Sequence, residues 1–596
     1  MATYKAPQRE IRFVAHEVCD FENHYKNLGS ADVDAATIDS FIEAGAQFSE
    51  NELAPLNRSG DEEGCHFADG QVTTPAGFKE AYQKYCELGF PALSADENYG
   101  GSGMPGSLST VINEMTGTAN WSWAMYPGLS HGAMETLKHH GTEEQKQNYL
   151  TKLISGEWTG TMCLTESHAG SDLGIIKTKA VPREDGSYAI SGTKIFISAG
   201  EHDMAENIVH IVLARLPDAP AGTKGISLFV VPKFLVEDGE VGARNSVTCG
   251  SIEHKMGIKA SATCVINFDS ATGYLIGPEN KGLNCMFTFM NVARIGTAVQ
   301  GLAAAELAFQ GSLEYARDRL AMRSMSGPKA PDKPADPIIV HPAVRNMLLT
   351  QKAFAEGGRA LIYTLAQYAD EVEVMKGDSK AHADEMLSFL TPIAKAFLTE
   401  TGFEAAKHGV QVYGGHGFIR EWGMEQNVRD TTIACLYEGT TEIQSLDLLG
   451  RKVLGSKGKL LKNFTDMIGA FARAHGENPD MAEFIAPLAK ATHTWGELTQ
   501  LIGQRGMENP DEVGAAAVDY MYYSGYVTLA FFWARMAQIA QKALADGTSE
   551  TEFYEAKLKT ARFYFAKLMP RTATHAASIK AGGATLMEMG EEQFAF

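Results

Sequence analysis

The spacing of apolar residues divides the chain into helical and strand-forming blocks. From about Ile38 to Gly156, segments such as FIEAGAQFSENELAPL and EEQKQNYLTKLISGEW carry apolar residues at helical spacing. From about Thr159 to Gly277, short stretches rich in β-branched residues alternate with turn residues. No long helix separates these stretches, which predicts an antiparallel β domain rather than a doubly wound sheet. The clearest predicted strands are YAISGTKIFIS, NIVHIVLARL, GISLFVVP and ATCVINFDS.

Helical spacing returns after Gly282. RIGTAVQGLAAAELAFQGSLEYARDRL, residues 294–320, predicts a long helix with one buried face. The proline-rich GPKAPDKPADP then predicts a loop, and further helices follow in HPAVRNMLLTQKAFAEGGRALIYTLAQYA and MLSFLTPIAKAFLTETGFEAAKHGVQVYG. The predicted order is an N-terminal extension (1–37), a helical domain (38–158), a middle β domain (159–280), a second helical domain (281–455) and an extra helical domain (456–596).

Composition narrows the class of protein. A chain of 596 residues exceeds one hydrophobic core, and its net charge of −21 argues against nucleic acid and anionic membranes as partners. The eight cysteines are scattered without a CxxC pair, so we expect neither a metal site nor disulfides, and a reducing cytoplasm fits best. The N-terminus lacks the apolar core of a secretory signal. YVTLAFFWARMAQIA is interrupted by Arg535, which predicts a buried helix rather than a membrane span.

A GxGxxG pattern occurs in YGGSGMPG, at Gly101, Gly103 and Gly106. A dinucleotide-binding loop needs a strand before it and a helix that opens on the glycines. Here a helical segment precedes the motif and Pro105 interrupts it. The sequence therefore favours an ordinary loop.

Two motifs in the β domain offer chemistry, although each has a simpler explanation. MCLTESHAGSD contains Thr165, Gly170 and Ser171, whose small size lets a backbone approach a phosphate or a flat ring. Polar turns of this kind are also common in loops. In SGTKIFISAG, Phe196 and Ser198 share one face of a predicted strand, which suits a cofactor ring but also ordinary packing.

Three motifs in the helical block are equally open when taken singly. Arg319 ends the predicted long helix, where a guanidinium suits a pyrophosphate or simply the helix dipole. QVYGGHGF, residues 411–418, has more glycines than a helix cap needs. LYEGTTEIQ, residues 436–444, holds Glu438 between an aromatic residue and a glycine, where it serves as a base or faces water.

Taken in order, LTESHAGSD, GTKIFIS, QVYGGHGF and LYEGTTEIQ resemble the acyl-CoA dehydrogenase family, over roughly Ile38 to Val453. The total length resembles a long subgroup of that family. The resemblance implies a mostly α fold with a central antiparallel, β-barrel-like domain, a four-helix-bundle-like domain and an extra helical domain. It also implies an FAD-dependent enzyme that converts an acyl-CoA into a 2-enoyl-CoA. The implied partners are an electron-transfer flavoprotein as electron acceptor and a second copy in a homodimer.

The resemblance also assigns roles to single residues. Glu438 falls on the catalytic base, which removes the α-proton while the flavin N5 accepts the β-hydride. Arg294 and Gly439 fall on substrate contacts, and no metal is implied. The implied FAD contacts are Thr165, Gly170, Ser171, Phe196, Ser198, Arg319, Gln411, Gly414, Gly415 and Thr440.

Glu438 is favoured over another base because residues 281–300 contain no Asp or Glu. Desolvation beside an acyl chain is expected to raise the pKa of its carboxylate. Two positions depart from the family: LAMRSMSGPKAP follows the long helix, and Glu442 stands where Gln is usual. Met286, Phe287 and Met290 are acyl-pocket candidates, with core packing favoured. The alternatives are an acyl-CoA oxidase using O₂, a flavin monooxygenase or nitroalkane oxidase, and a non-catalytic assembly protein on the same scaffold.

Overall fold

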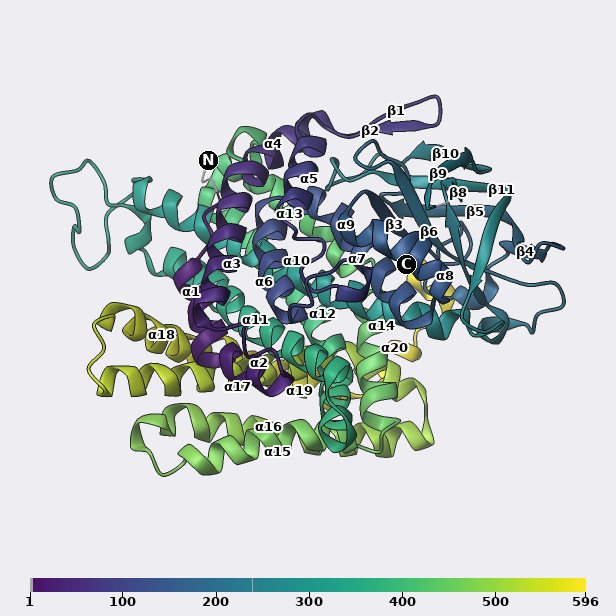
Figure 1. Ribbon diagram of the computed structural model, residues 1–596. Coiled ribbons are helices and arrows are strands. Elements are labelled where there is room, and N and C mark those ends of the chain that lie inside the picture. The colour runs from purple at the N-terminus through teal and green to yellow at the C-terminus, as the bar shows by residue number, and fades with distance from the viewer. Residues whose placement is uncertain (1–3, 238) are drawn as a thin grey trace. The chain divides into compact units, whose positions relative to one another are not determined.

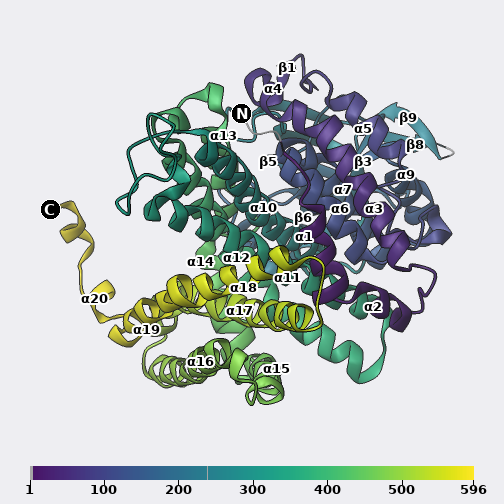
Figure 2. The same ribbon diagram turned by 90° about the vertical axis from the view of Figure 1, so that its left-hand side faces the viewer.

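The computed structural model describes residues 4–237 and 239–596. The chain forms two compact units, one from residues 4–6 and 37–296 and the other from residues 7–36 and 297–596. Figures 1 and 2 label their helices and strands. Within the described residues, every helix is too short or too polar to cross a membrane.

The unit of residues 37–296 begins with helices around a small hairpin. α7 begins where Asn120 accepts a hydrogen bond from the backbone N–H of Trp123, which caps the helix. The GxGxxG loop opens α6 at Gly106, but a short 3-10 turn precedes it in place of the strand that a dinucleotide-binding loop needs, which agrees with the prediction of an ordinary loop. The elements are α3 (Ala35–Phe48), α4 (Ala54–Glu63), β1 (His66–Ala68), β2 (Gln71–Thr73), α5 (Phe78–Glu87), α6 (Gly106–Ala119), α7 (Trp121–His140), α8 (Glu143–Gln145) and α9 (Thr151–Ser155).

The predicted strands form a sheet with the order β3-β6-β7-β11-β5-β4, and β10 pairs with β11. Its pairs are antiparallel, as predicted, except β3 and β6, which run parallel. The long strand β11 pairs first with β5 and β10 and later with β7, so it links both halves of the sheet. The strands are β3 (Trp158–Cys163), β4 (Lys179–Pro182), β5 (Tyr188–Ser198), β6 (Asn207–Ala214), β7 (Ser227–Pro232), β10 (Val247–Ile252) and β11 (Thr263–Ile276), with a separate hairpin of β8 (Phe234–Glu237) and β9 (Glu240–Arg244).

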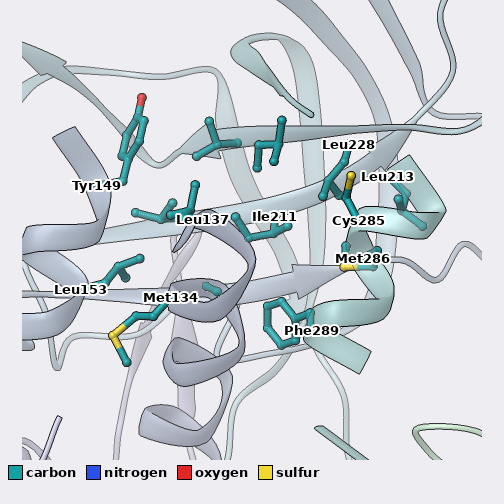
Figure 3. Packing of buried hydrophobic residues seen from close by; sticks show 14 of the residues in the cluster. Met134, Leu137, Tyr149, Leu153, Ile211, Leu213, Leu228, Cys285, Met286 and Phe289 are labelled. Atoms are coloured by element: carbon teal, nitrogen blue, oxygen red, sulfur yellow. The ribbon is translucent and has the colours of Figure 1, made fainter. Parts of the chain in front are cut away.

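One hydrophobic core joins the helices of this unit to its sheet. Figure 3 shows Leu137 of α7 and Ile211 of β6 facing Met286 and Phe289, which lie on the first turns of α10 (Gly282–Asp318). Met286 is fully buried, and a Cβ added to Gly132 would lie 2.3 Å from the ring of Phe289. The burial of Met286 within this cluster confirms that it packs in the core, the favoured interpretation of that residue.

The second unit is almost wholly helical, and Figure 2 shows α15, α16 and α17 packed beside one another. The predicted buried helix YVTLAFFWARMAQIA lies within α17, where Trp533 is fully buried. The helices are α1 (Gln8–Arg12), α2 (Phe21–Leu28), the later part of α10, α11 (Pro342–Val374), α12 (Gly377–Tyr413), α13 (Met424–Thr432), α14 (Thr441–Leu446), α15 (Lys459–His475), α16 (Ala482–Glu508), α17 (Asp511–Ala545), α18 (Thr551–Phe563), α19 (Thr572–Ala581) and α20 (Ala584–Met587).

Helix α10 differs from the prediction of one buried face, because every residue from 297 to 306 is buried. The cause is a close crossing with α12 at two glycines. A Cβ added to Gly301 would lie 2.2 Å from the carbonyl oxygen of Leu398, and one added to Gly402 would lie 2.3 Å from that of Gly301. On its other sides α10 accepts a hydrogen bond from Asn427 of α13 at the Ala304 carbonyl.

The N-terminal segment packs within this second unit. His24 of α2 lies 3.4 Å from Asp370 of α11. Lys557 of α18 pairs with Glu10 of α1 and, at 2.8 Å, with Glu356 of α11. Residues 7–36, which form most of the predicted N-terminal extension, therefore contact both α11 and α18. The limits of all the predicted domains stay a prediction.

Candidate active site

The loop after β3 carries the first predicted cofactor residues. Glu166 and Ala169 exchange two backbone hydrogen bonds, of 2.8 and 3.0 Å, which close a tight turn. Thr165 just before the turn accepts a bond from the N–H of Ile195 in β5. Gly170 follows the turn and is exposed, as is the next residue, Ser171. Their backbone is accessible to a ligand because the turn is held from its buried side.

A buried ion pair anchors this turn. Glu166 Oε1 accepts hydrogen bonds from Lys194 Nζ at 2.9 Å and from the hydroxyl and N–H of Thr178. Burial acts to raise the pKa of Glu166, but Lys194 and the hydrogen bonds outweigh it and lower that pKa to about 2. Glu166 therefore stays ionised, and the charge on Lys194 is neutralised inside the domain.

Phe196 is exposed because β5 contains a bulge. Cys264 pairs with Ile197 and Ile266 with Lys194, so that two residues, Ile195 and Phe196, lie opposite one residue of β11. Side chains alternate along a strand; Lys194 points inward before the bulge and Ile197 after it. The bulge thus turns Phe196 outward, where 58% of it is exposed.

The backbone at Phe196 is left-handed, with φ 59°. This conformation is uncommon for a residue with a Cβ and marks local strain, which is often found at functional sites. An outward aromatic ring on the strand that bonds to Thr165, together with the accessible backbone of Gly170 and Ser171, fits the flat, polar-edged ring of a flavin. Ser198 lies two residues further along β5 and is half-buried, on the same face of the strand as Phe196. These residues therefore fit the expected FAD.

The ends of α10 and α12 meet in an aromatic cluster. The rings of Tyr315 and Tyr413 stack at 4.2 Å between centroids, and the Tyr315 hydroxyl lies 2.9 Å from Nδ1 of His416. This cluster brings together four predicted cofactor residues, all of them exposed. They are Arg319, Gln411, Gly414 and Gly415.

The proline-rich loop after α10 is held by one carboxylate. Asp336 is fully buried and accepts hydrogen bonds from the backbone N–H groups of Ser324, Lys329 and Ala330 and from Arg323. These bonds hold the pKa of Asp336 well below its usual range. The departure from the family in this loop is therefore an ordered, internally bonded turn.

Glu438 lies in the loop before α14, and its side chain is half-buried. Its backbone is left-handed, with φ 56°. Gln444 Nε2 donates to the carbonyl oxygen of Glu438 at 2.9 Å, and Lys395 Nζ donates to that of Gly439 at 2.6 Å. The Thr440 hydroxyl caps α14 by accepting from the N–H of Ile443. The contact of Thr440 with the cofactor stays a prediction.

Within the second unit the predicted residues fall into two groups rather than one. Within α12, Gln411 lies sixteen residues after Lys395, so the aromatic cluster is roughly 24 Å along the helix from the Glu438 loop. The exposed residues around Phe196 form a third group, in the other unit. Arg294 belongs to that unit as well, and only 8% of it is exposed. Its contact with CoA stays a prediction.

Sequence reasoning missed the residues that support these groups. Lys194, Lys395 and Gln444 are all fully buried, although each has a polar side chain. A signal was present, because Lys395 stands among apolar residues in TPIAKAF and Lys194 occupies an inward position of an alternating strand. Buried polar groups are nearly always bonded to something specific, but the bonded partner lies elsewhere in the sequence.

Comparison with known proteins gives one consistent result. Models of the acyl-CoA dehydrogenase N-terminal, middle and C-terminal domains match residues 36–157, 161–271 and 280–454. A model described as acetyl-CoA dehydrogenase C-terminal like matches residues 464–590. The chain belongs to the acyl-CoA dehydrogenase family. As a member it is an FAD-dependent oxidoreductase, and the predicted fold class is confirmed.

Two curated relatives match along nearly their whole length. The chain is 41% identical to the 3-methylmercaptopropionyl-CoA dehydrogenase of Ruegeria pomeroyi, over 98% of this chain and 99% of the relative. It is 34% identical to a butyryl-CoA dehydrogenase of Syntrophomonas wolfei, over 99% of each. Among solved structures, Caenorhabditis elegans ACDH-11 in complex with C11-CoA superposes with a TM-score of 0.79 at 17% identity, covering 99% of this chain and 96% of that one.

Proposed function

We propose that the enzyme oxidises an acyl-CoA thioester to the trans-2-enoyl-CoA with Glu438 as the base. The α-proton of a thioester is weakly acidic, so its removal needs a base held against the α-carbon and donors near the carbonyl oxygen. A carboxylate oxygen of Glu438 takes that proton. The backbone of Glu438 and Gly439 supplies an N–H donor for the carbonyl. Bound FAD supplies the acceptor for the β-hydride.

The observation that carries this proposal is the strained backbone of Glu438 in a loop fixed from its buried side. Strain of this kind persists only where the surroundings enforce it, and it gathers at functional sites. No rival acid occurs over residues 281–300, on the helix that follows the sheet.

Glu438→Gln tests the base directly. We expect the variant to fold and to keep its FAD while turnover falls by at least about 10³-fold, because an amide cannot accept the proton. Glu508→Gln, an exposed position on α16, is the matched control and is expected to behave like the parent. Near-parental turnover in Glu438→Gln would remove Glu438 from this role.

For the substrate we propose 3-methylmercaptopropionyl-CoA, converted to methylthioacryloyl-CoA. The support is the similarity along the whole chain to the Ruegeria pomeroyi enzyme of that name. A comparison of kcat/KM for methylthiopropionyl-, butyryl-, octanoyl- and palmitoyl-CoA tests this. We expect the methylthio thioester to give the highest value, and a preference for any straight-chain thioester would contradict it.

For the electron acceptor we propose an electron-transfer flavoprotein. Support comes from the likeness to a chain from structural work on the electron transferring flavoprotein of Acidaminococcus fermentans, at 26% identity, a TM-score of 0.57 and coverage of 70% of this chain and 97% of that one. Peroxide formed in step with substrate, without added acceptor, would instead identify an oxidase.

We further propose a cytoplasmic homodimer. The eight cysteines are all free thiols, which suits a reducing compartment. Arg319 is exposed and directly follows α10, whose end meets the end of α12 through the stacked rings of Tyr315 and Tyr413. This position suits contact with the pyrophosphate of a cofactor held by a second copy. Light scattering of the purified protein should give twice the chain mass, and a monomer that retains FAD would contradict this arrangement.

A further inference from the structure

The residues of the Glu438 loop are tied to different parts of the second unit. The Tyr437 hydroxyl donates to Gln300 of α10, and Thr441 donates to Glu400 of α12 at 2.5 Å. Two carbonyls between them are bonded from within the unit by the buried side chains of Gln444 and Lys395. The loop is thus fixed through two side-chain hydroxyls and two backbone carbonyls, and the Glu438 side chain takes no part in the carbonyl bonds.

From this geometry we infer that Lys395 and Gln444 are positioning residues for Glu438. The inference rests on the proposed role of Glu438 as the base. It goes further by naming the groups that hold the carboxylate where it can reach a substrate. Neither residue carries out a chemical step. Both act on the carbonyl groups of Glu438 and Gly439.

The conformation of the loop explains why these two hydrogen-bond donors, Lys395 and Gln444, here called the clamps, are needed. A left-handed backbone at a residue with a Cβ costs free energy, so Glu438 would relax if its neighbours did not hold it. Gly439 also has a positive φ, of 88°, and turns the chain sharply at this point. Two donors from different elements fix the two peptide groups that define this turn.

The hydrogen-bond donor of Gln444 explains why a polar side chain is buried at this position. Its side chain is fully buried, and within the described residues its Oε1 has no hydrogen-bond partner, whereas its Nε2 is bonded to Glu438. An orphaned buried acceptor is a cost that calls for an explanation. The hydrogen bond from Gln444 Nε2 to the carbonyl oxygen of Glu438 supplies that explanation. A Cβ added to Gly439 would lie 2.6 Å from this Nε2, so the glycine also leaves room for the clamp.

Lys395 acts from the other side of the loop. Its side chain on α12 is fully buried, unlike that of an ordinary surface lysine. Its Nζ donates a hydrogen bond to the carbonyl oxygen of Gly439 at 2.6 Å. A misplacement of a catalytic group by about 1 Å costs as much as 10²-fold in rate. Removal of either clamp should therefore strongly reduce the rate constant of α-proton removal. It should change the affinity for substrate much less.

The variants Lys395→Met and Gln444→Met, alone and together, test this. Each keeps an unbranched side chain but removes the donor. Thr401→Val is the matched control, since Thr401 is buried on α12 and its hydroxyl donates to backbone oxygens of the same helix. FAD content and Tm are measured first, so that loss of folding is separated from loss of position.

The kinetic readout is the rate of flavin bleaching in a single turnover at saturating acyl-CoA, beside KM. We expect each clamp variant to lose about 10- to 100-fold in rate with KM changed by less than about 3-fold. The double variant should lose far less than the product of the two, because both side chains hold one turn. Rates within about 2-fold of the parent in folded, FAD-bound variants would overturn the inference.

A second readout does not depend on activity. Hydrogen–deuterium exchange of the peptide covering residues 433–446 should become faster in both clamp variants and stay unchanged in Thr401→Val. If the parent protein is bleached by no acyl-CoA, the proposed function fails, and the exchange comparison still decides whether Lys395 and Gln444 hold the loop. Unchanged exchange in both variants would reject the clamps.

Discussion

Lys194 of β5 donates a hydrogen bond of 2.9 Å to Glu166 in the loop after β3, and the side chains of both residues are buried. The pair fixes the turn that exposes Gly170 and Ser171 and lies directly before the bulge that exposes Phe196. One buried contact thus joins the loop of Gly170 and Ser171 to the strand that carries Phe196.

Glu166→Gln should destabilise the protein by about 3–5 kcal/mol, because it leaves the Lys194 side chain buried without its counter-charge. Urea unfolding measures this. Glu157→Gln is the control: Glu157 pairs with Lys152 at the surface of the same unit, and its loss should cost less than about 1 kcal/mol. Equal effects would mean that burial of the pair is unimportant.

The lowered pKa of Glu166 predicts that the protein loses stability in acid. Its pKa is about 2 in the folded protein against 4.5 for the ordinary group. Because the folded pKa is the lower one, its contribution to stability is complete above pH 4.5 and is lost as pH falls from 4.5 towards 2. The parent should lose stability over this range more steeply than Glu166→Gln in thermal melts. Parallel curves would contradict the assignment.

Phe196→Ala should weaken FAD binding without unfolding the protein. The ring is mostly exposed, so its loss leaves no cavity, whereas a stacked aromatic pair contributes about 0.5–1.5 kcal/mol, or roughly 2- to 12-fold in Kd. Fluorescence of released FAD gives the Kd. Phe67→Ala, on β1, removes another partly exposed ring and should leave the Kd unchanged.

Gly301→Ala tests the crossing of α10 and α12. The added Cβ would lie 2.2 Å from the Leu398 oxygen, so the helices must separate, at a cost of about 1–3 kcal/mol. Gly514→Ala in α17 has open space around it and should instead stabilise the protein by up to about 1 kcal/mol. Thermal unfolding decides, and a stabilised Gly301→Ala variant would show that the crossing is loose.

Lys557→Met tests the contact between the N-terminal segment and α18. Lys557 is 2% exposed and pairs with both Glu10 and Glu356, so its removal should cost about 3–5 kcal/mol. Lys559→Met on the same helix breaks an exposed pair with Glu555 and should cost less than about 0.5 kcal/mol. Similar Tm values for the two variants would show that the N-terminal segment contributes little.

The sequence by itself determined the elements and the motifs. β5 begins and ends where YAISGTKIFIS does, because β-branched residues and turn signals are local. The four ordered motifs identified the family. Glycine density in QVYGGHGF correctly marked the end of α12, since a helix end is also a local feature.

Tertiary structure alone decided which side chains support the site. The bulge that turns Phe196 outward depends on pairing with β11, and the burial of residues 297–306 of α10 on all sides depends on the crossing with α12. Lys395 reaches Gly439 across 44 residues of sequence. Such pairs are set by where distant elements pack, and apolar periodicity records only which face of an element is buried, not which polar group meets it there.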